Sequence, residues 1–201
     1  MKKNKFQLKR EATYRKLIEA ADKCFLEKGF AATTIGDIVA ITGHTNGAFY
    51  GHFESKEQLF LHILDYRQEL SSGWTETPKQ YRPENTTLEE VVTISVMRLQ
   101  EMLKGNENFK NWILVLVDFY MQTKHKPELH SVLKNKYQEW VAGIANFIDA
   151  LKEQGWVSQD KDSHQIAKLV LAYNDGFSVN WVLFEGPDPQ SYIQGLVRLL
   201  S

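Results

Sequence analysis

The chain has 201 residues, of which 43% are hydrophobic and 24% are charged, and its formal net charge is −1. This balance is typical of a globular chain and excludes a disordered one. No apolar run approaches the roughly 18–20 residues that span a bilayer, and no apolar stretch follows the basic N-terminus. A single cysteine, Cys24, excludes an internal disulfide framework. We therefore expect a cytoplasmic protein without a membrane partner.

The first helices are marked by clear start and stop signals. Apolar residues at three- and four-residue spacing predict a helix over about 7–28, which Gly29 ends. Thr34 offers the N-cap of a second helix over about 35–42, which Gly43 ends. We therefore expect two helices of very different length before residue 43.

Two further capping signals follow closely. Thr45 is predicted to cap a short helix over about 46–51. Ser55 and Gln58 have the spacing of a capping box, which predicts the start of a longer helix that reaches about residue 70. Segment 71–85 contains glycine and prolines and is predicted to be an irregular loop.

The rest of the chain repeats the helical pattern, and strand patterns are nearly absent. The capping box of Thr87 and Glu90 opens the next predicted helix, and glycine, proline or capping residues bound the others. These helices cover about 87–104, 108–123, 127–154, 162–185 and a last segment that ends near residue 200. The sequence thus predicts an all-α fold of about nine helices, whose first three form a small helix-turn-helix module.

Charge is distributed unevenly along the chain. Residues 1–62 hold 10 Lys and Arg against 7 Asp and Glu, whereas the remainder holds 14 against 18. The first ten residues contain no acidic side chain and carry Lys2, Lys3, Lys5, Lys9 and Arg10. A basic end on an acidic body is expected when only that end meets phosphate, although a solvated tail would give the same pattern.

Residues 34–53 have the spacing of a helix-turn-helix, with two short helices that meet at a glycine. In this motif the second helix enters the major groove of DNA, and its first residues face the base edges. Thr45 and Asn46 offer a hydroxyl and an amide that can hydrogen-bond to bases, and the methyl group of Ala48 can contact thymine. The motif therefore predicts binding to double-stranded DNA.

The block GFAATTIGDIVAITGHTNGAFYGHFESKEQLF resembles the N-terminal module of the TetR family of regulators, with a similarity over about residues 11–64. The matching positions include Ala20, Ala21, Phe25, Gly29, Phe30, Thr33, Thr34, Tyr50, His52, Phe53, Ser55, Lys56 and Glu57. By position, the resemblance implies base reading by Thr45, Asn46 and Ala48. It implies phosphate contacts by Thr34, Tyr50, His52 and Lys56, and a module core of Phe25, Ile38, Phe49 and Phe53.

Three positions depart from the family pattern. Val39 and Thr42 stand where alanines are usual, and His44 stands where a small aliphatic residue is usual. His44 is interpreted as a structural histidine with a hydrogen-bond partner, and a pH switch is the alternative.

The resemblance fades after residue 64, and it implies a second domain that binds a small effector and forms a homodimer. We therefore expect a DNA-binding domain over 1–53 and an effector-binding and dimerisation domain over 54–201, with helix 56–70 connecting them. The predicted helix 108–123 is apolar on all sides, which indicates a buried central helix. Asp118 inside it either pairs with a basic group or faces a polar or liganded cavity.

By analogy with the family, the candidate pocket residues are Met97, Trp112, Asp118, Phe119, Tyr137, Trp140, Tyr173 and Phe177. Their aromatic character favours an apolar or aromatic effector. The resemblance also implies that the last two helices form the dimer interface. A mid-helix glycine, which costs about 1 kcal/mol against alanine, supports this because it suits close approach of a partner backbone. The candidate interface residues are Gly176, Val179, Trp181, Leu183, Tyr192, Leu196 and Leu199.

An enzyme is the first rival reading. The sequence contains no Gly-rich phosphate loop, no HExxH or GxSxG motif and no convincing metal-ligand spacing, and Cys24 lies within an amphipathic helix. We therefore predict no catalytic residues, no metal and no cofactor. The prediction is a ligand-responsive repressor that binds a palindromic operator as a dimer. The alternatives are a transcriptional activator, or a helical small-molecule-binding or interaction protein that does not bind DNA.

Overall fold

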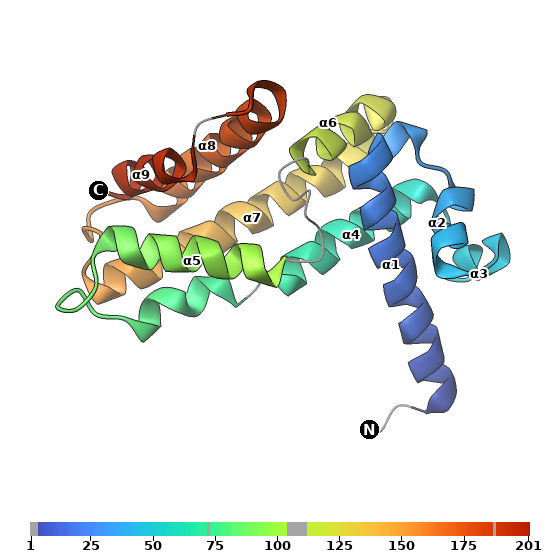
Figure 1. Cartoon of the computed structure of the whole chain (residues 1–201), viewed down its shortest axis with the longest axis horizontal. Helices are drawn as coiled ribbons and strands as arrows, with labels where there is room; N and C mark the ends of the chain where they lie inside the picture. The colour runs from blue at the N-terminus through green and yellow to red at the C-terminus, as the bar shows by residue number, and fades with distance from the viewer. Residues whose placement is uncertain (1–3, 72, 104–111, 187) are drawn as a thin grey trace. The chain divides into compact units, whose positions relative to one another are not determined.

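A computed structural model describes residues 4–71, 73–103, 112–186 and 188–201. Over these residues the chain forms helices and no strands (Figure 1). This confirms the predicted all-α fold. The elements are α1 (Lys5–Ala32), α2 (Ile35–Thr42), α3 (Asn46–Tyr50), α4 (Lys56–Leu70), the 3-10 helix η1 (Trp74–Gln80), α5 (Leu88–Met102), α6 (Trp112–Thr123), α7 (Pro127–Gln154), α8 (Ser163–Phe184) and α9 (Pro189–Leu200).

Most helix starts follow the predicted caps. The hydroxyls of Thr34, Thr45 and Thr87 accept the backbone N–H groups of the residues three positions later, and Asp162 caps α8. Helix α1 is longer than predicted. Its backbone leaves the helical region at Gly29, where φ is 82°, and a further turn then continues to Ala32.

Segment 71–85 differs from the predicted irregular loop, because Trp74–Gln80 forms the helix η1. Thr77 and Pro78 are buried, and the ring of Trp74 lies 4.6 Å from that of Phe147 in α7. Burial against α7 therefore orders a segment whose local sequence favours a turn. The predicted helix start at 108–111 lies outside the described residues.

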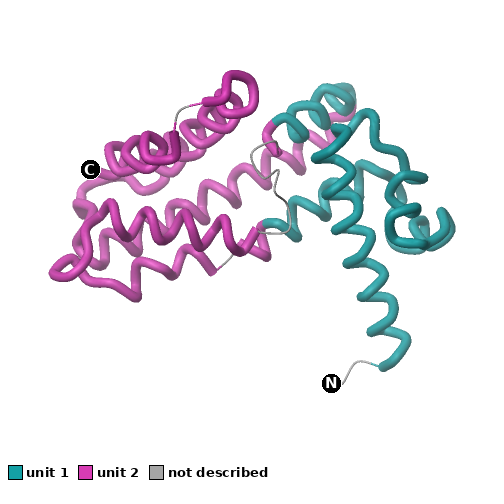
Figure 2. The backbone as a smooth tube through the Cα atoms, in the orientation of Figure 1, with its two compact units in different colours: residues 1–67, 114–125 teal, residues 68–113, 126–201 magenta. Residues whose placement is uncertain are grey.

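The chain divides into two compact units, which Figure 2 colours separately. Unit 1 comprises residues 1–67 and 114–125, and unit 2 comprises residues 68–113 and 126–201. Unit 1 thus contains most of α4 and α6 in addition to the helix-turn-helix. Helices α4 and α6 each begin in one unit and end in the other.

The core of unit 1 is built from aromatic rings. The predicted core residues Phe25, Ile38, Phe49 and Phe53 are at most 1% exposed, as expected. Phe119 of α6 joins this core, because its ring stacks on that of Phe60 with centroids 4.1 Å apart. Helix α6 therefore contributes to the body that holds the helix-turn-helix.

Unit 2 has a separate core around α7. Helix α7 packs against α8 and η1, while α5 packs against η1 and α9. The buried residues at this core include Val91, Val141, Ile148, Leu151, Ala167 and Leu196. Five helices of unit 2 thus surround a shared apolar interior.

Candidate nucleic-acid interface and internal cavity

The turn between α2 and α3 depends on two local features. Gly43 ends α2 with φ of 67°, a left-handed conformation that favours glycine, and its N–H donates to the carbonyl oxygen of Val39. The hydroxyl of Thr45 then accepts the N–H of Ala48 at 3.2 Å and starts α3. The left-handed Gly43 and the cap at Thr45 therefore define the turn between α2 and α3.

The predicted base-reading residues lie together on the first turn of α3. Thr45 and Asn46 are exposed and Ala48 is half-buried. Phe49, one residue further, is fully buried in the core of unit 1. The buried ring fixes α3 on its inner face and leaves the small polar residues on the outer face.

The predicted phosphate contacts Thr34, Tyr50 and His52 have different surroundings. Tyr50 is 58% exposed. The hydroxyl of Thr34 donates to Asp37 at 2.7 Å, within the capping box of α2, so a phosphate contact requires it to leave that partner. His52 is half-buried beside Tyr14, and burial, together with the nearby charges of Arg10 and His44, lowers its pKa.

Lys56 is engaged inside unit 1. Its ammonium group donates to the carbonyl oxygens of Phe30 and Thr33 at 2.7 Å each, and to that of Ala31 at 3.3 Å. It also lies 4.4 Å from the centre of the Phe30 ring. This geometry differs from the predicted phosphate contact, because the three ammonium hydrogens are directed at the carbonyl groups that end α1.

Asp118 supports the same end of α1 from α6. Its Oδ2 accepts the backbone N–H of Ala31 at 2.8 Å, and it would lie 3.0 Å from a Cβ atom at Gly29. The sequence left open whether Asp118 pairs with a basic group or faces a cavity. The structure shows a third arrangement, in which the carboxylate accepts from the backbone where Gly29 interrupts the helix. Burial lowers the pKa of Lys56, and Glu57 and Asp118 oppose that shift.

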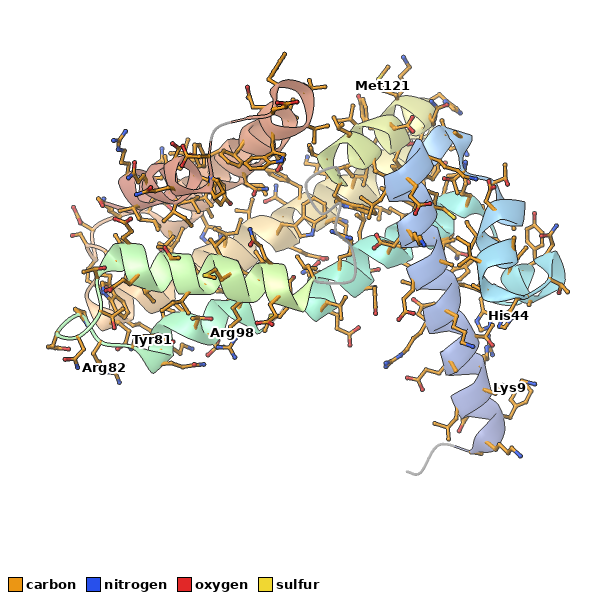
Figure 3. All side chains as sticks on the ribbon, viewed as in Figure 1. Lys9, His44, Tyr81, Arg82, Arg98 and Met121 are labelled. Carbon is orange, nitrogen blue, oxygen red and sulfur yellow. The ribbon has the colours of Figure 1, made fainter. Side chains whose placement is uncertain are left out.

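His44 has a hydrogen-bond partner, as expected for a structural histidine. Its Nε2 lies 3.3 Å from the hydroxyl oxygen of Thr13 on α1, and its side chain is half-buried (Figure 3). This hydrogen bond joins the α2–α3 turn to α1. A small aliphatic residue cannot make such a bond. The hydrogen bond to Thr13 therefore satisfies the polar side chain that stands here in place of the aliphatic residue usual in the family.

Sequence reasoning missed a hollow beside α3. It has a volume of about 390 Å³ and is lined by Gln7, Arg10, Glu11, Tyr14 and His52. The exposed first turns of α1 carry Lys5, Lys9 and Arg10, and Figure 3 shows Lys9 near the start of this helix. The basic residues at the start of the chain were the available signal. The sequence alone does not show which of these residues lie on the side of α1 that faces His52.

Unit 2 contains a cavity of about 570 Å³, a volume within the range of roughly 300–1,000 Å³ that holds drug-sized ligands. Its described wall is mainly apolar and comes from η1, α5, α7, α8 and α9. The aromatic lining residues are Trp74, Phe147, Phe177, Trp181 and Tyr192. The polar lining residues, besides Tyr192, are Ser95, Gln100, Asn174 and Ser178.

The predicted pocket residues fit this cavity poorly, with Phe177 the one that lines it. Asp118 and Phe119 belong to unit 1, where they hold α1 and fill its core. Met97 is 63% exposed and Tyr137 is 38% exposed, so both lie on outer faces of their helices. Trp112, Trp140 and Tyr173 are half-buried and are not among the lining residues; the ring of Tyr173 stacks on that of Tyr192.

The predicted dimer residues separate into two groups. Trp181, Tyr192 and Leu196 line the cavity. Gly176 is exposed and Leu183 is 58% exposed, while Val179 and Leu199 are half-buried. The exposed group continues along the outer face of α8 at spacings of three, four and seven residues, as Leu169, Ala172, Gly176 and Leu183.

The described residues contain no helix that is long and apolar enough to cross a membrane. Within the same residues, no group of three or more His, Cys, Asp or Glu side chains is placed to hold a metal ion. The candidate sites among the described residues are the helix-turn-helix surface and the cavity of unit 2.

Comparison with protein families gives two matches. The family described as "Bacterial regulatory proteins, tetR family" matches residues 17–63. The family described as "BetI-type transcriptional repressor, C-terminal" matches residues 97–200. The first match contains the helix-turn-helix, and the second contains most of the cavity wall.

Individual proteins show the same relationship. The chain is similar to the uncharacterized HTH-type transcriptional regulator YwcC of Bacillus subtilis, with 28% identity over 98% of this chain and 88% of the relative. It is 26% identical to the HTH-type transcriptional regulator TtgR of Pseudomonas putida, over 86% of this chain and 81% of TtgR.

Solved structures agree on the fold. A TetR-family regulator from Rhodococcus sp. has a TM-score of 0.71 at 18% identity and covers 94% of this chain and 98% of its own. The regulator FadR from Bacillus subtilis, solved in complex with stearoyl-CoA, has a TM-score of 0.67 at 16% identity, again over 94% and 98% of the two chains.

Proposed function

The chain belongs to the TetR family of bacterial transcriptional regulators, and from this membership we propose that it represses transcription from a palindromic operator, as a homodimer whose DNA binding responds to a small ligand. It is a helix-turn-helix regulator of transcription and not an enzyme. The observation that supports operator binding most strongly is the exposed first turn of α3, with Thr45 and Asn46 outward and Phe49 buried behind them. Because the operator lies on the chromosome, we expect the protein to act in the cytoplasm.

Replacing Asn46 with alanine is expected to weaken operator binding by about 10- to 100-fold, since a good side-chain contact to a base edge contributes about 1–3 kcal/mol of discrimination. Genomic DNA fragments recovered with the purified protein supply the operator, and fluorescence anisotropy measures the affinity. Gln138→Ala, at an exposed position of α7, is the matched control and should bind normally. Equal affinities for the two variants would refute base reading by α3.

The start of α1 is proposed to contact phosphate next to α3. Arg10 lines the hollow that His52 also lines, and Lys9, the residue before it in α1, is exposed. Tyr50 and His52 remain our proposed phosphate contacts from the helix-turn-helix, together with the hydroxyl of Thr34. Lys56 is proposed to position the helix-turn-helix, because its ammonium group closes the end of α1.

Lys9→Ala with Arg10→Ala is expected to lower the slope of log affinity against log salt by up to about 1.8, at about 0.9 for each lost phosphate contact. The measurement is operator binding between 50 and 300 mM salt. Lys134→Ala with Lys136→Ala removes the same charge from α7 and should leave the slope unchanged. A slope that stays the same in the α1 variant would show that the basic start of the chain does not meet DNA.

The cavity of unit 2 is proposed as the effector site, for an apolar or aromatic molecule. Its volume and aromatic wall support this assignment. We propose that an occupied cavity holds the two DNA-binding modules of the dimer at the wrong separation for the operator, through α4. Helices α4 and α6 suit this role because each runs from one unit into the other.

Homodimerisation is proposed through α8 and α9. The outer face of α8 exposes Leu169, Ala172, Gly176 and Leu183 in a single stripe. A Cβ atom at Gly176 would have no neighbour within 4 Å, so this part of α8 is open to close approach by a second helix. Packing of α8 and α9 against the same helices of a second protomer would bury this stripe in a four-helix bundle.

A further inference from the structure

Two tyrosines join α8 and α9, one on each helix, and each donates a hydrogen bond to the other helix. The hydroxyl of Tyr192 on α9 donates to Oδ1 of Asn174 on α8 at 3.0 Å. The hydroxyl of Tyr173 on α8 donates to the carbonyl oxygen of Ser191 at 3.2 Å, at the start of α9. The two rings stack, with centroids 5.7 Å apart and planes 10° apart. We call this arrangement, formed by Tyr173, Asn174 and Tyr192, the tyrosine seam.

Gly195 makes the tyrosine seam possible. A Cβ atom at this position would lie 2.1 Å from the hydroxyl oxygen of Tyr173, which is far inside van der Waals contact. The absence of a side chain at Gly195 therefore leaves room for the Tyr173 ring to pack directly on α9. The hydrogen bonds and the close approach show that α8 and α9 are matched to each other at this point.

One half of the tyrosine seam is also cavity wall. Asn174 and Tyr192 both line the cavity, so their mutual hydrogen bond lies at its surface. Burial raises the pKa of Tyr192, which keeps the phenol protonated and able to donate. Ser95, another polar lining residue, donates at 2.6 Å to the carbonyl oxygen of Val91 within its own helix. The bond between Asn174 and Tyr192 differs from this because it joins two helices.

The cavity wall carries no formal charge among the described lining residues. Asp175 follows Asn174 in the chain and is not one of them. Burial raises the pKa of its carboxyl group, and a hydrogen bond from the Asn174 side chain opposes that shift. An anionic ligand would therefore lose its hydration in the cavity without meeting a cationic lining side chain, and a cationic ligand would have to compete with Asn174 for the carboxylate of Asp175. The wall instead offers aromatic surface from Trp74, Phe177 and Trp181, which suits a flat, uncharged ring system.

We propose that the cavity binds an uncharged aromatic ligand that carries a hydroxyl group, and that this hydroxyl inserts between Tyr192 and Asn174. An inserted hydroxyl can accept from the phenol of Tyr192 and donate to Oδ1 of Asn174, so that both buried groups keep a partner. A carbonyl oxygen can only accept, and it would leave Asn174 without its donor. The chemistry of the pair therefore selects a phenol or alcohol over a ketone.

The inserted group also separates the two helices by roughly the width of one oxygen atom. Because α8 carries the proposed dimer stripe on its outer face, this inference rests on the proposed function and names its ligand and its point of action. Ligand binding is thereby coupled to the α8–α9 pair that holds two protomers together.

The test uses four fluorescent probes that share one ring system: pyrene, 1-hydroxypyrene, 1-pyrenecarboxylate and 1-pyrenemethylammonium. Equilibrium titration of the full chain at pH 7 without DNA gives the affinities. We expect 1-hydroxypyrene to bind about five- to tenfold tighter than pyrene, as for one net hydrogen bond. Both charged probes should bind at least about a hundredfold more weakly than 1-hydroxypyrene.

Three variants test whether Tyr192 and Asn174 cause the preference for 1-hydroxypyrene over pyrene. Tyr192→Phe and Asn174→Leu should each abolish the preference for 1-hydroxypyrene over pyrene. Tyr173→Phe removes the other half of the tyrosine seam, which does not line the cavity, and should preserve the preference. Thermal melts of the variants without ligand establish whether each variant is folded. If one variant does not fold, the order of probe affinities in the unaltered protein still tests the proposal.

Three results would overturn the proposal. The first is equal binding of 1-hydroxypyrene and pyrene. The second is a preference that survives in folded Tyr192→Phe and Asn174→Leu. The third is tighter binding of a charged probe, with the cation implicating Asp175. These titrations contain no DNA, so a protein that ranks the probes as expected but binds no operator would refute the repressor function and leave the ligand class supported.

Discussion

Replacing Arg67 with methionine is expected to lower the free energy of unfolding by about 3–5 kcal/mol, because it leaves a buried acid without its partner. The guanidinium Nη1 donates to both carboxylate oxygens of Asp22, at 3.0 and 3.1 Å. Each side chain is about 10% exposed. Burial raises the pKa of Asp22, and Arg67 opposes that shift. Without Arg67, the pKa of Asp22 should rise further.

The loss should depend on pH in a definite direction. A carboxyl group whose pKa is higher in the folded state than in the unfolded state destabilises the fold increasingly as pH rises above the unfolded value, about 3.9. Urea denaturation between pH 4.5 and 8 should therefore show the difference between Arg67→Met and the unaltered protein growing with pH. The double variant with Asp22→Leu should recover most of the stability. A loss below 1 kcal/mol at pH 7, or one that is constant with pH, would contradict the assignment.

Phe119→Ala is expected to cost a similar amount, about 3–5 kcal/mol, through an unfilled cavity in the core of unit 1. The Phe119 ring is fully buried, stacks on Phe60 and meets the edge of Phe30 at 4.9 Å between centroids. Denaturant unfolding measures the loss. Met121→Ala, on the same helix at a side chain that is 51% exposed, should change stability by no more than about 0.5 kcal/mol.

This experiment also separates the two readings of Phe119. The family resemblance implies that Phe119 lines the effector pocket, whereas the structure places it in the core of unit 1. If Phe119→Ala left stability nearly unchanged but weakened binding of the pyrene probes by the folded protein, the pocket reading would be restored. The structure predicts the opposite pair of results.

The helix-turn-helix was predictable because its determinants are local. The caps at Thr34 and Thr45 and the left-handed turn at Gly43 are encoded within a few residues of the positions they control. The buried positions Ile38 and Phe49 follow the helical repeat on either side of that turn. Segments of this kind fold as their own sequence indicates, with little override from distant contacts.

The cavity was not predictable in the same way, since its wall is assembled from five separate elements. The continuous apolar character of α6 indicated a central helix of the ligand domain, but Phe119 packs with α1 and α4 in unit 1. Similarly, Trp181 and Tyr192 have the spacing of an exposed interface, yet both line the cavity. Periodicity identifies a buried face without identifying the partner that buries it.

The contacts at the end of α1 could not be predicted from the sequence for a second reason. Lys56 and Asp118 are distant in sequence, and both act on backbone groups that exist only because Gly29 leaves the helical conformation. Lys56 donates hydrogen bonds to the carbonyl groups at the end of α1, while Asp118 accepts one from the N–H of Ala31. A family position can indicate a charged contact, but its partner depends on the local backbone geometry. Within unit 1, Asp118 thus connects α6 to the helix that supports α2 and α3.

Sequence-specific binding distinguishes a regulator of transcription from a protein that binds DNA through charge alone. The most direct measurement is fluorescence anisotropy of a labelled duplex, taken from genomic DNA recovered with the protein, in competition with mixed-sequence DNA at 150 mM salt. We expect two protomers per duplex and binding at least about a thousandfold tighter than to the competitor. Equal affinity for the recovered and mixed-sequence duplexes would contradict this expectation.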